Sequence, residues 1–172
     1  VLIIDRSGSM TGKKIADAKD AAKVFLGYTD ERDQVGLVTF SSTVQSVSPL
    51  NYMTTGNKES LTKKINSITA VGATDMYDAI VAANNMLLNS SRSNAPRVEV
   101  LLTDGNHNWP SVLSDSAFLD LANQAKNKDI IIYTIGLGSD VSGDRLRMIA
   151  DTTGGTYYFA ATSSELRAIY ED

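Results

Sequence analysis

The chain opens with Val1-Leu2-Ile3-Ile4-Asp5-Arg6-Ser7-Gly8-Ser9-Met10, an apolar run that stops at a carboxylate and a polar loop. Such a short apolar run, rich in β-branched residues, predicts a strand that is covered on both faces of a sheet. A helical pattern follows, marked by Ile15, Ala18, Ala22 and Phe25. A buried strand, a polar loop and a helix in this order are typical of α/β proteins with a parallel sheet.

The same rhythm continues along the rest of the chain. Strands are predicted at residues 1–4, 35–40, 44–47, 98–103, 130–135 and 156–159. After the first helix, apolar residues recur with helical spacing in the segments 61–68, 76–87, 118–125, 146–150 and 166–169. Strands that alternate with helices in this way predict a mainly parallel, doubly wound sheet with right-handed crossovers.

One pair of strands departs from this rhythm. The second and third strands are separated only by Ser41-Ser42-Thr43, a hairpin length that is far too short for a parallel crossover. One strand should therefore run antiparallel at an edge of the sheet, and Pro49 soon afterwards suits an edge. The sequence predicts a single α/β domain over residues 1–172, with a doubly wound, mainly parallel six-stranded sheet, one antiparallel edge strand and helices on both faces.

Composition narrows the classes of function. The chain has 172 residues, a formal net charge of −4 and a pI of about 5.0, which argues against nucleic acid or an anionic membrane as a partner. The absence of cysteine excludes disulfides, thiolate metal sites and cysteine nucleophiles. No run approaches the ~20 apolar residues that span a bilayer. Because the chain opens inside an apolar run, we expect a domain excised from a longer parent chain. Separately, we expect this domain to be monomeric.

The loop after the first strand carries the first candidate site. Asp5, Ser7 and Ser9 provide one carboxylate and two hydroxyls on alternate residues, an oxygen-only set that suits a hard cation such as Mg²⁺. A structural alternative exists for the isolated pattern. Ser7 or Ser9 could cap the following helix, and Asp5 could accept loop amides.

Fold geometry brings two further oxygens to the same place. In a doubly wound sheet with strand order 3-2-1-4-5-6, the first and fourth strands are neighbours where the order reverses, and ligands bind beyond their carboxyl ends. The fourth strand ends in Asp104-Gly105, and the preceding helix begins on the same edge at Gly72-Ala73-Thr74-Asp75. Taken singly, Thr74 or Asp75 could be a helix cap and Asp104 part of an ordinary turn. Their convergence with Asp5 favours a shared ion.

These five positions, Asp5, Ser7, Ser9, Thr74 and Asp104, resemble the metal-ion-dependent adhesion site of von Willebrand factor A-type domains. The flanking sequence is also similar, in Leu101-Leu102-Thr103-Asp104-Gly105, in Ile135-Gly136-Leu137-Gly138 and in Thr153-Gly154-Gly155. The resemblance covers nearly the whole chain and implies a Rossmann-like fold. It also implies a non-enzymatic domain that binds other proteins.

The resemblance assigns a role to each position. Ser7 and Ser9 are expected to ligate the metal directly, and Thr74 directly in a ligand-bound state and through water otherwise. Asp5 and Asp104 are expected to act mainly through bridging waters. A shell of mostly neutral oxygens leaves the ion poorly neutralised, so an Asp or Glu of a protein partner could displace the remaining water. The expected ion is Mg²⁺, with Mn²⁺ or Ca²⁺ as alternatives.

The neighbourhood of the site adds four expectations. Residues 11–14, Thr-Gly-Lys-Lys, offer no extra acids, so no second metal site is expected beside the first. The pair Lys13-Lys14 is expected to be a solvated helix start. In the long loop 106–116, His107 is expected to be solvated. Trp109 either contacts a partner or folds back over apolar surface.

Two other functions compete with this hypothesis. A Mg²⁺-dependent phosphotransferase of the haloacid dehalogenase type also places an aspartate after the first strand, but its general acid two residues later is replaced by Ser7. An intracellular A-type domain that assists an ATP-driven assembly machine is the second alternative. The Ser/Thr/Asn-rich loops favour a cell-surface or extracellular location, with a cytoplasmic one as the alternative.

Overall fold

A computed structural model describes residues 1–160 except 93, 140 and 142. The strands are β1 (Leu2–Asp5), β2 (Gln34–Phe40), β3 (Val44–Tyr52), β4 (Arg97–Thr103), β5 (Ile130–Leu137) and β6 (Tyr157–Ala160). The helices are α1 (Lys13–Tyr28), α2 (Thr55–Asn66), α3 (Met76–Leu88), α4 (Asp115–Lys126) and α5 (Gly143–Thr153), with a 3₁₀ turn, η1, at Gly8–Met10. The predicted segment 166–169 lies outside the described residues.

The sheet has the predicted topology. Its strand order is β3-β2-β1-β4-β5-β6, and every neighbouring pair is parallel except β2 with β3. The doubly wound, mainly parallel six-stranded sheet with one antiparallel edge strand is therefore confirmed. In the register of β1 with β4, Ile4 lies opposite Leu102. The next residues, Asp5 and Thr103, are the last of their strands and therefore lie side by side at the carboxyl end of the sheet.

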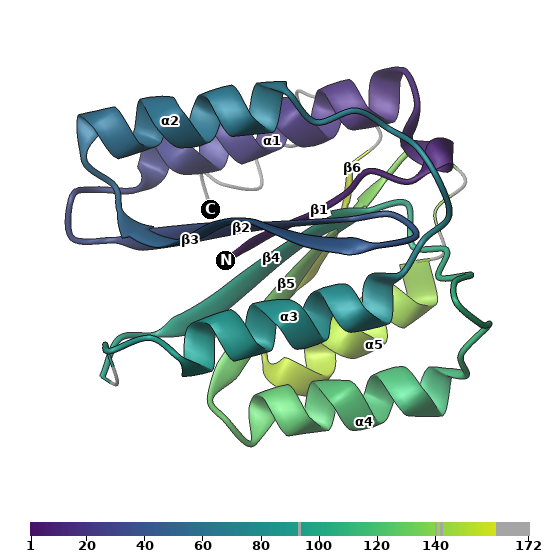
Figure 1. Cartoon of the computed structure of the whole chain (residues 1–172). Helices are drawn as coiled ribbons and strands as arrows, with labels where there is room; N and C mark the ends of the chain where they lie inside the picture. Colours follow the sequence, from purple (N-terminus) through teal and green to yellow (C-terminus); the bar gives the residue numbers. More distant parts are fainter. Residues whose placement is uncertain (93, 140, 142, 161–172) are drawn as a thin grey trace.

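Helices cover both faces of the sheet, as Figure 1 shows, with α1 and α2 on one side and α3, α4 and α5 on the other. Each layer encloses its own apolar core. Leu2, Leu37 and Leu102 belong to the core under α1 and α2, whereas Ile3 and Leu101 belong to the core under α3 to α5. Alternate residues of each central strand are therefore buried on opposite faces, which explains why these strands are continuously apolar in sequence.

The edge strand is longer than predicted. β3 continues to Tyr52 rather than ending at residue 47, and it includes Pro49. The pairing shifts between Val35 and Leu37 on β2, where the partners change from Asn51 to Ser48. Pro49 lies in this irregularity, and a residue without an N–H is tolerated because an edge strand has no further neighbour to bond.

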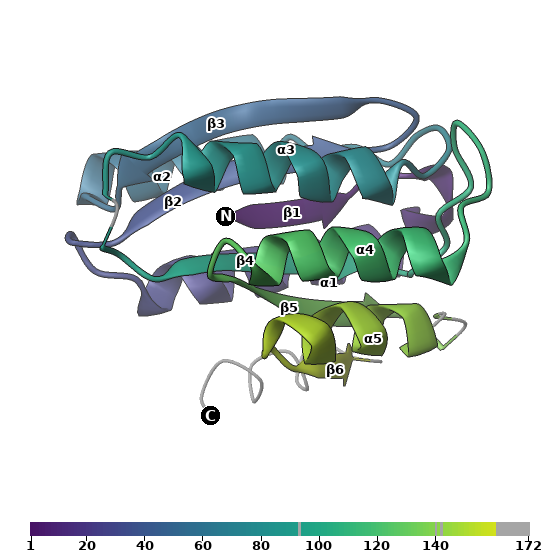
Figure 2. The same cartoon turned by 90° about the horizontal axis from the view of Figure 1, so that it is seen from below.

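Three chain segments meet at the carboxyl end of the sheet. The loop after β1, the start of α3 and the loop after β4 all lie at the right-hand end of the molecule in Figures 1 and 2. To reach this end, residues 67–75 pass from α2 on one face of the sheet to α3 on the other. Among the described residues, no helix combines the length and apolar character needed to cross a lipid bilayer.

Glu99 of β4 is a buried acid inside this framework. It is 0% exposed, and neither of its carboxylate oxygens has a hydrogen-bond partner among the described residues. Burial raises the pKa of Glu99 to about 8, against a smaller opposing effect of the Val1 amino group. Burial in turn lowers the pKa of that amino group to about 6. Ionised Glu99 is therefore a source of instability in the folded domain.

Replacing Glu99 with glutamine should stabilise the domain at alkaline pH. Because the folded-state pKa lies above the ordinary value of 4.5, the stability associated with protonated Glu99 is lost as pH rises from about 4.5 to about 8. Relative to wild type, Glu99→Gln should therefore gain on the order of 3 kcal/mol between pH 5 and pH 9. Urea unfolding of both proteins at the two pH values measures this. A difference that is the same at both would contradict the burial effect.

Candidate metal centre

Asp5 is held at the end of β1 by hydrogen bonds from two segments. Its Oδ1 accepts from the backbone N–H of Ser7 at 2.8 Å, and its Oδ2 accepts from the Thr103 hydroxyl at 2.6 Å. The second bond joins the ends of two neighbouring strands, and the same Thr103 hydroxyl accepts from the N–H of Gly105 at 3.0 Å. Asp5 is therefore fixed in orientation before any ligand arrives.

The two serines do not serve as helix caps. Ser7 precedes η1 without a side-chain cap hydrogen bond, and the residue before α1 is Gly12, which has no side chain to offer. The Ser7 and Ser9 hydroxyl oxygens lie 3.1 Å apart instead. Ser7 is buried, whereas Ser9 is exposed. The capping alternative therefore does not apply to either serine, although Asp5 does accept a loop amide.

The loop that carries Thr74 is bonded to the loop after β1. The Gly8 N–H donates to the Gly72 carbonyl at 2.8 Å, and the Val71 N–H donates to the Arg6 carbonyl at 2.7 Å. Gly72 has φ +84°, and a Cβ there would lie 2.8 Å from the Ser42 hydroxyl oxygen. Both the backbone conformation and the close approach therefore require glycine at this position.

The start of α3 leaves the Thr74 hydroxyl available. Asp75 caps the helix, because its side chain accepts from the Asp78 N–H. Thr74 is only 2% exposed, and its hydroxyl makes no hydrogen bond within the described part of the chain. Of the two capping alternatives, the structure uses Asp75, so Thr74 is not needed to complete the helix.

Asn108 attaches the loop after β4 to the same residue. Its side-chain oxygen accepts from the Thr74 N–H at 2.9 Å, and its own N–H donates to the Thr74 carbonyl at 3.1 Å. The Trp109 N–H also donates to that carbonyl, at 3.2 Å. Three backbone-directed bonds thus join the segment that carries Thr74 to the segment that follows Asp104.

Asp104 is buried with only part of its bonding capacity used. It is 1% exposed, its Oδ2 accepts from the Lys14 ammonium group at 3.2 Å, and its Oδ1 has no hydrogen-bond partner within the described residues. A buried carboxylate oxygen without a donor is costly unless another positive group satisfies it. This oxygen, next to the hydroxyl-rich loop, fits a divalent cation.

Charge accumulates at this end of the sheet. Burial raises the pKa of Asp5 to about 6, hydrogen bonds from Ser7 and Thr103 oppose the rise, and the negative charge of Asp104 adds to it. The two carboxylates are thus close enough to repel each other, and a cation would relieve that repulsion. Among the described residues, no group of three or more acidic, histidine or cysteine side chains is arranged so that it could hold a metal ion by itself. Any cation bound here would therefore need hydroxyl oxygens among its ligands.

Two of the neighbouring residues differ from expectation. His107 is buried at 5% exposure, because its Nδ1 accepts from the Met76 N–H and its ring packs edge-on against Phe118. The expectation of a solvated histidine was therefore wrong. Lys14 is also not simply solvated, since its side chain is 19% exposed and pairs with Asp104.

Lys13 and Trp109 are the other two residues whose surroundings were predicted from sequence. Lys13 is exposed and pairs with Asp17, as a helix-start lysine should. Trp109 is 46% exposed, so of its two alternatives the exposed aromatic is the one that the structure supports.

Sequence reasoning missed Thr103 and Asn108. Both are polar residues next to a predicted ligand in sequence or space, yet neither belongs to the five-position pattern. Thr103 could have been found from strand pairing, since the last residue of β4 must lie beside the last residue of β1. Asn108 could not, because its role depends on the path of an irregular loop.

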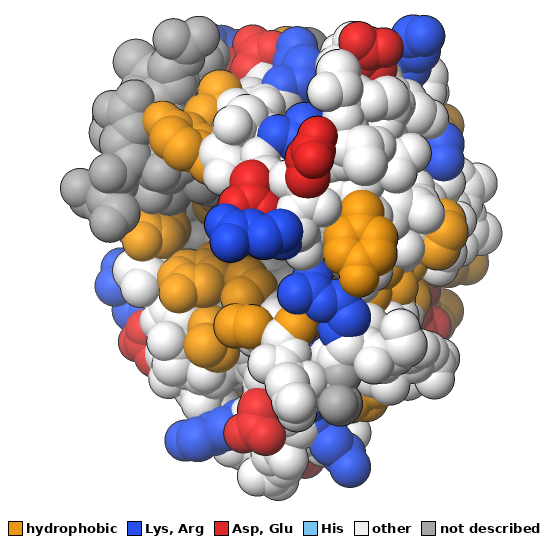
Figure 3. All heavy atoms as spheres, turned by 90° about the vertical axis from the view of Figure 1, so that its left-hand side faces the viewer, with side chains coloured by type: hydrophobic (Ala, Val, Ile, Leu, Met, Phe, Trp, Pro, Cys, Tyr) orange, Lys and Arg blue, Asp and Glu red, His pale blue; other side chains and the backbone are white. Residues whose placement is uncertain are grey.

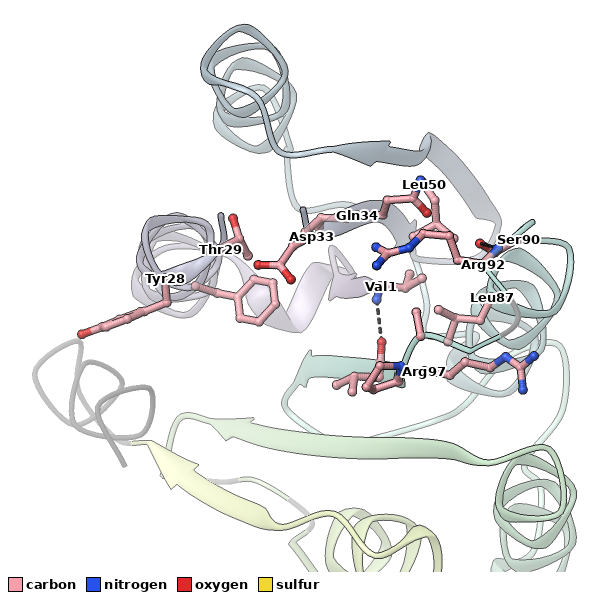
Figure 4. Close-up of a pocket in the computed structure, with 15 residues that line it drawn as sticks. Val1, Tyr28, Thr29, Asp33, Gln34, Leu50, Leu87, Ser90, Arg92 and Arg97 are labelled. Atoms are coloured by element: carbon pink, nitrogen blue, oxygen red, sulfur yellow. Dashed lines mark hydrogen bonds between the residues drawn. The ribbon is translucent and has the colours of Figure 1, made fainter. Parts of the chain in front are cut away.

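A hollow of about 360 Å³ lies at the opposite end of the sheet. Figure 3 shows that apolar and basic side chains gather at this end, and Figure 4 shows Tyr28, Leu50, Leu87 and Arg92 around the hollow. The Val1 amino group donates to the Val98 carbonyl there at 2.6 Å. None of the five predicted metal ligands lines this hollow, so it is separate from the candidate centre.

Sequence comparison identifies relatives over the full domain. A family model described as the von Willebrand factor type A domain matches residues 1–172. Calcium-activated chloride channel regulator 1 of Equus caballus is 30% identical over 95% of this chain, which corresponds to 17% of that protein. Inter alpha-trypsin inhibitor heavy chain 4 of Mus musculus is 28% identical over 100% of this chain and 18% of its own length. The chain thus spans less than a fifth of these curated relatives.

Comparison with solved structures agrees with the family match. The structure of a von Willebrand factor type A protein from Catenulispora acidiphila superposes with a TM-score of 0.86 at 22% identity, covering 98% of this chain and 40% of that one. At this identity the likeness concerns the fold alone, and the full-length family match carries the assignment. The chain belongs to the von Willebrand factor type A family, whose domains generally mediate interactions between proteins.

Proposed function

We propose that this domain binds a protein partner through a divalent metal ion. Asp5, Ser7, Ser9, Thr74 and Asp104 would hold the ion, with Mg²⁺ as the expected metal and Mn²⁺ or Ca²⁺ as alternatives. When bound, the ion would supply a Lewis-acidic position for an Asp or Glu carboxylate of the partner.

The observation that carries the proposal is the state of Asp104. Its Oδ1 is buried without a hydrogen-bond partner within the described residues, in a loop bonded to the one that carries Thr74. Water-accessible carboxylates need no explanation, but a buried and incompletely bonded one does. A cation shared with the hydroxyls of Ser7, Ser9 and Thr74 would satisfy this buried oxygen.

Several residues around the proposed ion have separate roles. Thr103 and the Ser7 N–H orient Asp5, so that this carboxylate contributes charge without rotating. Asn108 holds the backbone of Thr74 in place, and with it the position from which the Thr74 side chain extends. The exposed Ser9 and Trp109 lie where a partner would approach. Specificity would then come from the loop after Asp104.

The two competing functions fit the structure to different degrees. A phosphotransferase needs Asp5 as an accessible nucleophile, but this residue is 0% exposed and accepts two hydrogen bonds. An intracellular role beside an ATP-driven machine is compatible with the same metal chemistry. The Ser/Thr/Asn-rich loops favour a cell-surface or extracellular location for the domain.

Adding Mg²⁺ or Mn²⁺ should raise the melting temperature of the wild-type domain. At a concentration ten times the Kd, binding to the folded state stabilises by about 1.4 kcal/mol, which corresponds to roughly 3–6 °C for a domain of this size. The variant Thr74→Val keeps the side-chain shape and loses the hydroxyl, so its shift should be much smaller. Calorimetry with and without EDTA measures both.

Thr43→Val is the matched control, because Thr43 is an exposed hydroxyl residue in the turn between β2 and β3. It should show the wild-type shift. A wild-type melting temperature that does not respond to millimolar metal would count against the proposed ion site.

The loaded site should distinguish a carboxylate from its neutral analogue. Bound Mn²⁺ speeds the relaxation of water protons, and acetate that replaces a coordinated water should reduce this effect, whereas acetamide at the same concentration should not. Carboxylate capture is wrong if acetate and acetamide act equally on the Mn²⁺-loaded protein.

Asn108 should matter for metal affinity without being a ligand. Asn108→Ala removes the acceptor for the Thr74 N–H, and loss of such an outer support typically weakens binding by about 10–100-fold. Asn108→Asp retains an acceptor oxygen and should bind Mn²⁺ at least as tightly as wild type. Titration of each variant with Mn²⁺ checks the order, and equal affinity of Asn108→Ala and wild type would contradict it.

A further inference from the structure

Lys14 places a positive charge against one of the proposed metal ligands. Its Nζ lies 3.2 Å from Asp104 Oδ2, across 90 residues of sequence. The Lys14 side chain is 19% exposed and that of Asp104 is 1% exposed, so solvent screens this pair less than it screens a surface ion pair. The contact is therefore part of the interior electrostatics of the site.

The position of Lys14 in α1 is unfavourable by itself. The first turn of α1 contains two lysines and no acidic residue. The partial positive charge at a helix N-terminus repels cations and attracts anions. Lys13 reduces this cost through its pair with Asp17 one turn later, whereas Lys14 extends to Asp104. Of these two lysines, Lys14 is the one that directs its positive charge toward Asp104.

We propose that Lys14 is an internal counterion of the metal centre, which neutralises Asp104 in the metal-free domain and lowers the affinity for the divalent ion. This inference rests on the proposed function, because it concerns the same ion. It adds a regulating residue that is not a ligand and lies outside the five-position pattern.

The expected consequences follow from Coulomb's law. A cation near Asp104 reduces the attraction that this carboxylate exerts on a second cation. For the same reason, a bound ion stays less neutralised and attracts a carboxylate from outside more strongly. In the metal-free protein, Lys14 partly satisfies a buried acid and so stabilises the fold.

The test is a titration of the purified domain with MnCl₂ at pH 7, following free Mn²⁺ by electron paramagnetic resonance. Lys14→Met, which keeps the length of the side chain and removes its charge, should bind Mn²⁺ about tenfold more tightly than wild type. Lys14→Arg should stay within about threefold of wild type, because the charge is retained. Lys13→Met is the matched control, since it removes an adjacent charge that pairs elsewhere, and its affinity should be unchanged.

A second measurement separates this role from a purely structural one. In EDTA, Lys14→Met should melt below wild type, and saturating Mn²⁺ should raise its melting temperature by more than it raises that of wild type. A structural role would lower the melting temperature equally with and without metal, which would overturn the inference.

The titration can also fail in two separate ways. If wild type binds Mn²⁺ and Lys14→Met binds no more tightly, or if Lys13→Met gains as much, the counterion role is wrong while the metal site stands. If wild type and all variants leave millimolar Mn²⁺ unbound, the proposed function fails, and the counterion role fails with it.

Discussion

The parallel pairing of β1 with β4 is the constraint on which the site depends. It brings Asp5 and Thr103 out of the sheet side by side, and the 2.6 Å bond between them closes the carboxyl end of the pair. The strand order reverses at this point, where doubly wound sheets bind ligands in the crevice beyond the carboxyl ends of the strands. Asp104 follows Thr103 into the same space. Every other feature of the candidate centre is attached to this pair of strand ends.

The centre is built as a balance of charge rather than as an acidic cage. Burial raises the pKa of Asp5, and the negative charge of the second buried carboxylate, Asp104, adds to the rise. The remaining oxygens are hydroxyls, which do not add negative charge, and Lys14 contributes a positive one. Such a site would hold a divalent ion without fully neutralising it. That property distinguishes an ion that binds a partner from one that only stabilises a fold.

Much of this arrangement could be predicted from sequence, because it depends on periodic patterns. Continuous apolar strands and a three-residue hairpin predict a mainly parallel sheet with one antiparallel edge strand. With the strand order 3-2-1-4-5-6 of a doubly wound sheet, the strand ends then place residues 5 and 104 together. The roles of Asn108 and His107 were beyond prediction, since they depend on the path of an irregular loop across the start of α3. The Lys14 contact joins residues 90 positions apart. A lysine in a first helical turn offers no sequence signal of that reach.

The passage of residues 67–75 around the rim of the sheet has a geometric consequence. Its two ends are anchored to helices on opposite faces, and its middle is bonded to the loop after β1. The segment is therefore held at both ends and in its middle. Deleting one residue from it would shorten the available path by roughly 3.5 Å, more than the tolerance of any metal–oxygen bond. Homologous domains that bind an ion between these segments should thus vary in the identity of residues 67–75, but rarely in their number.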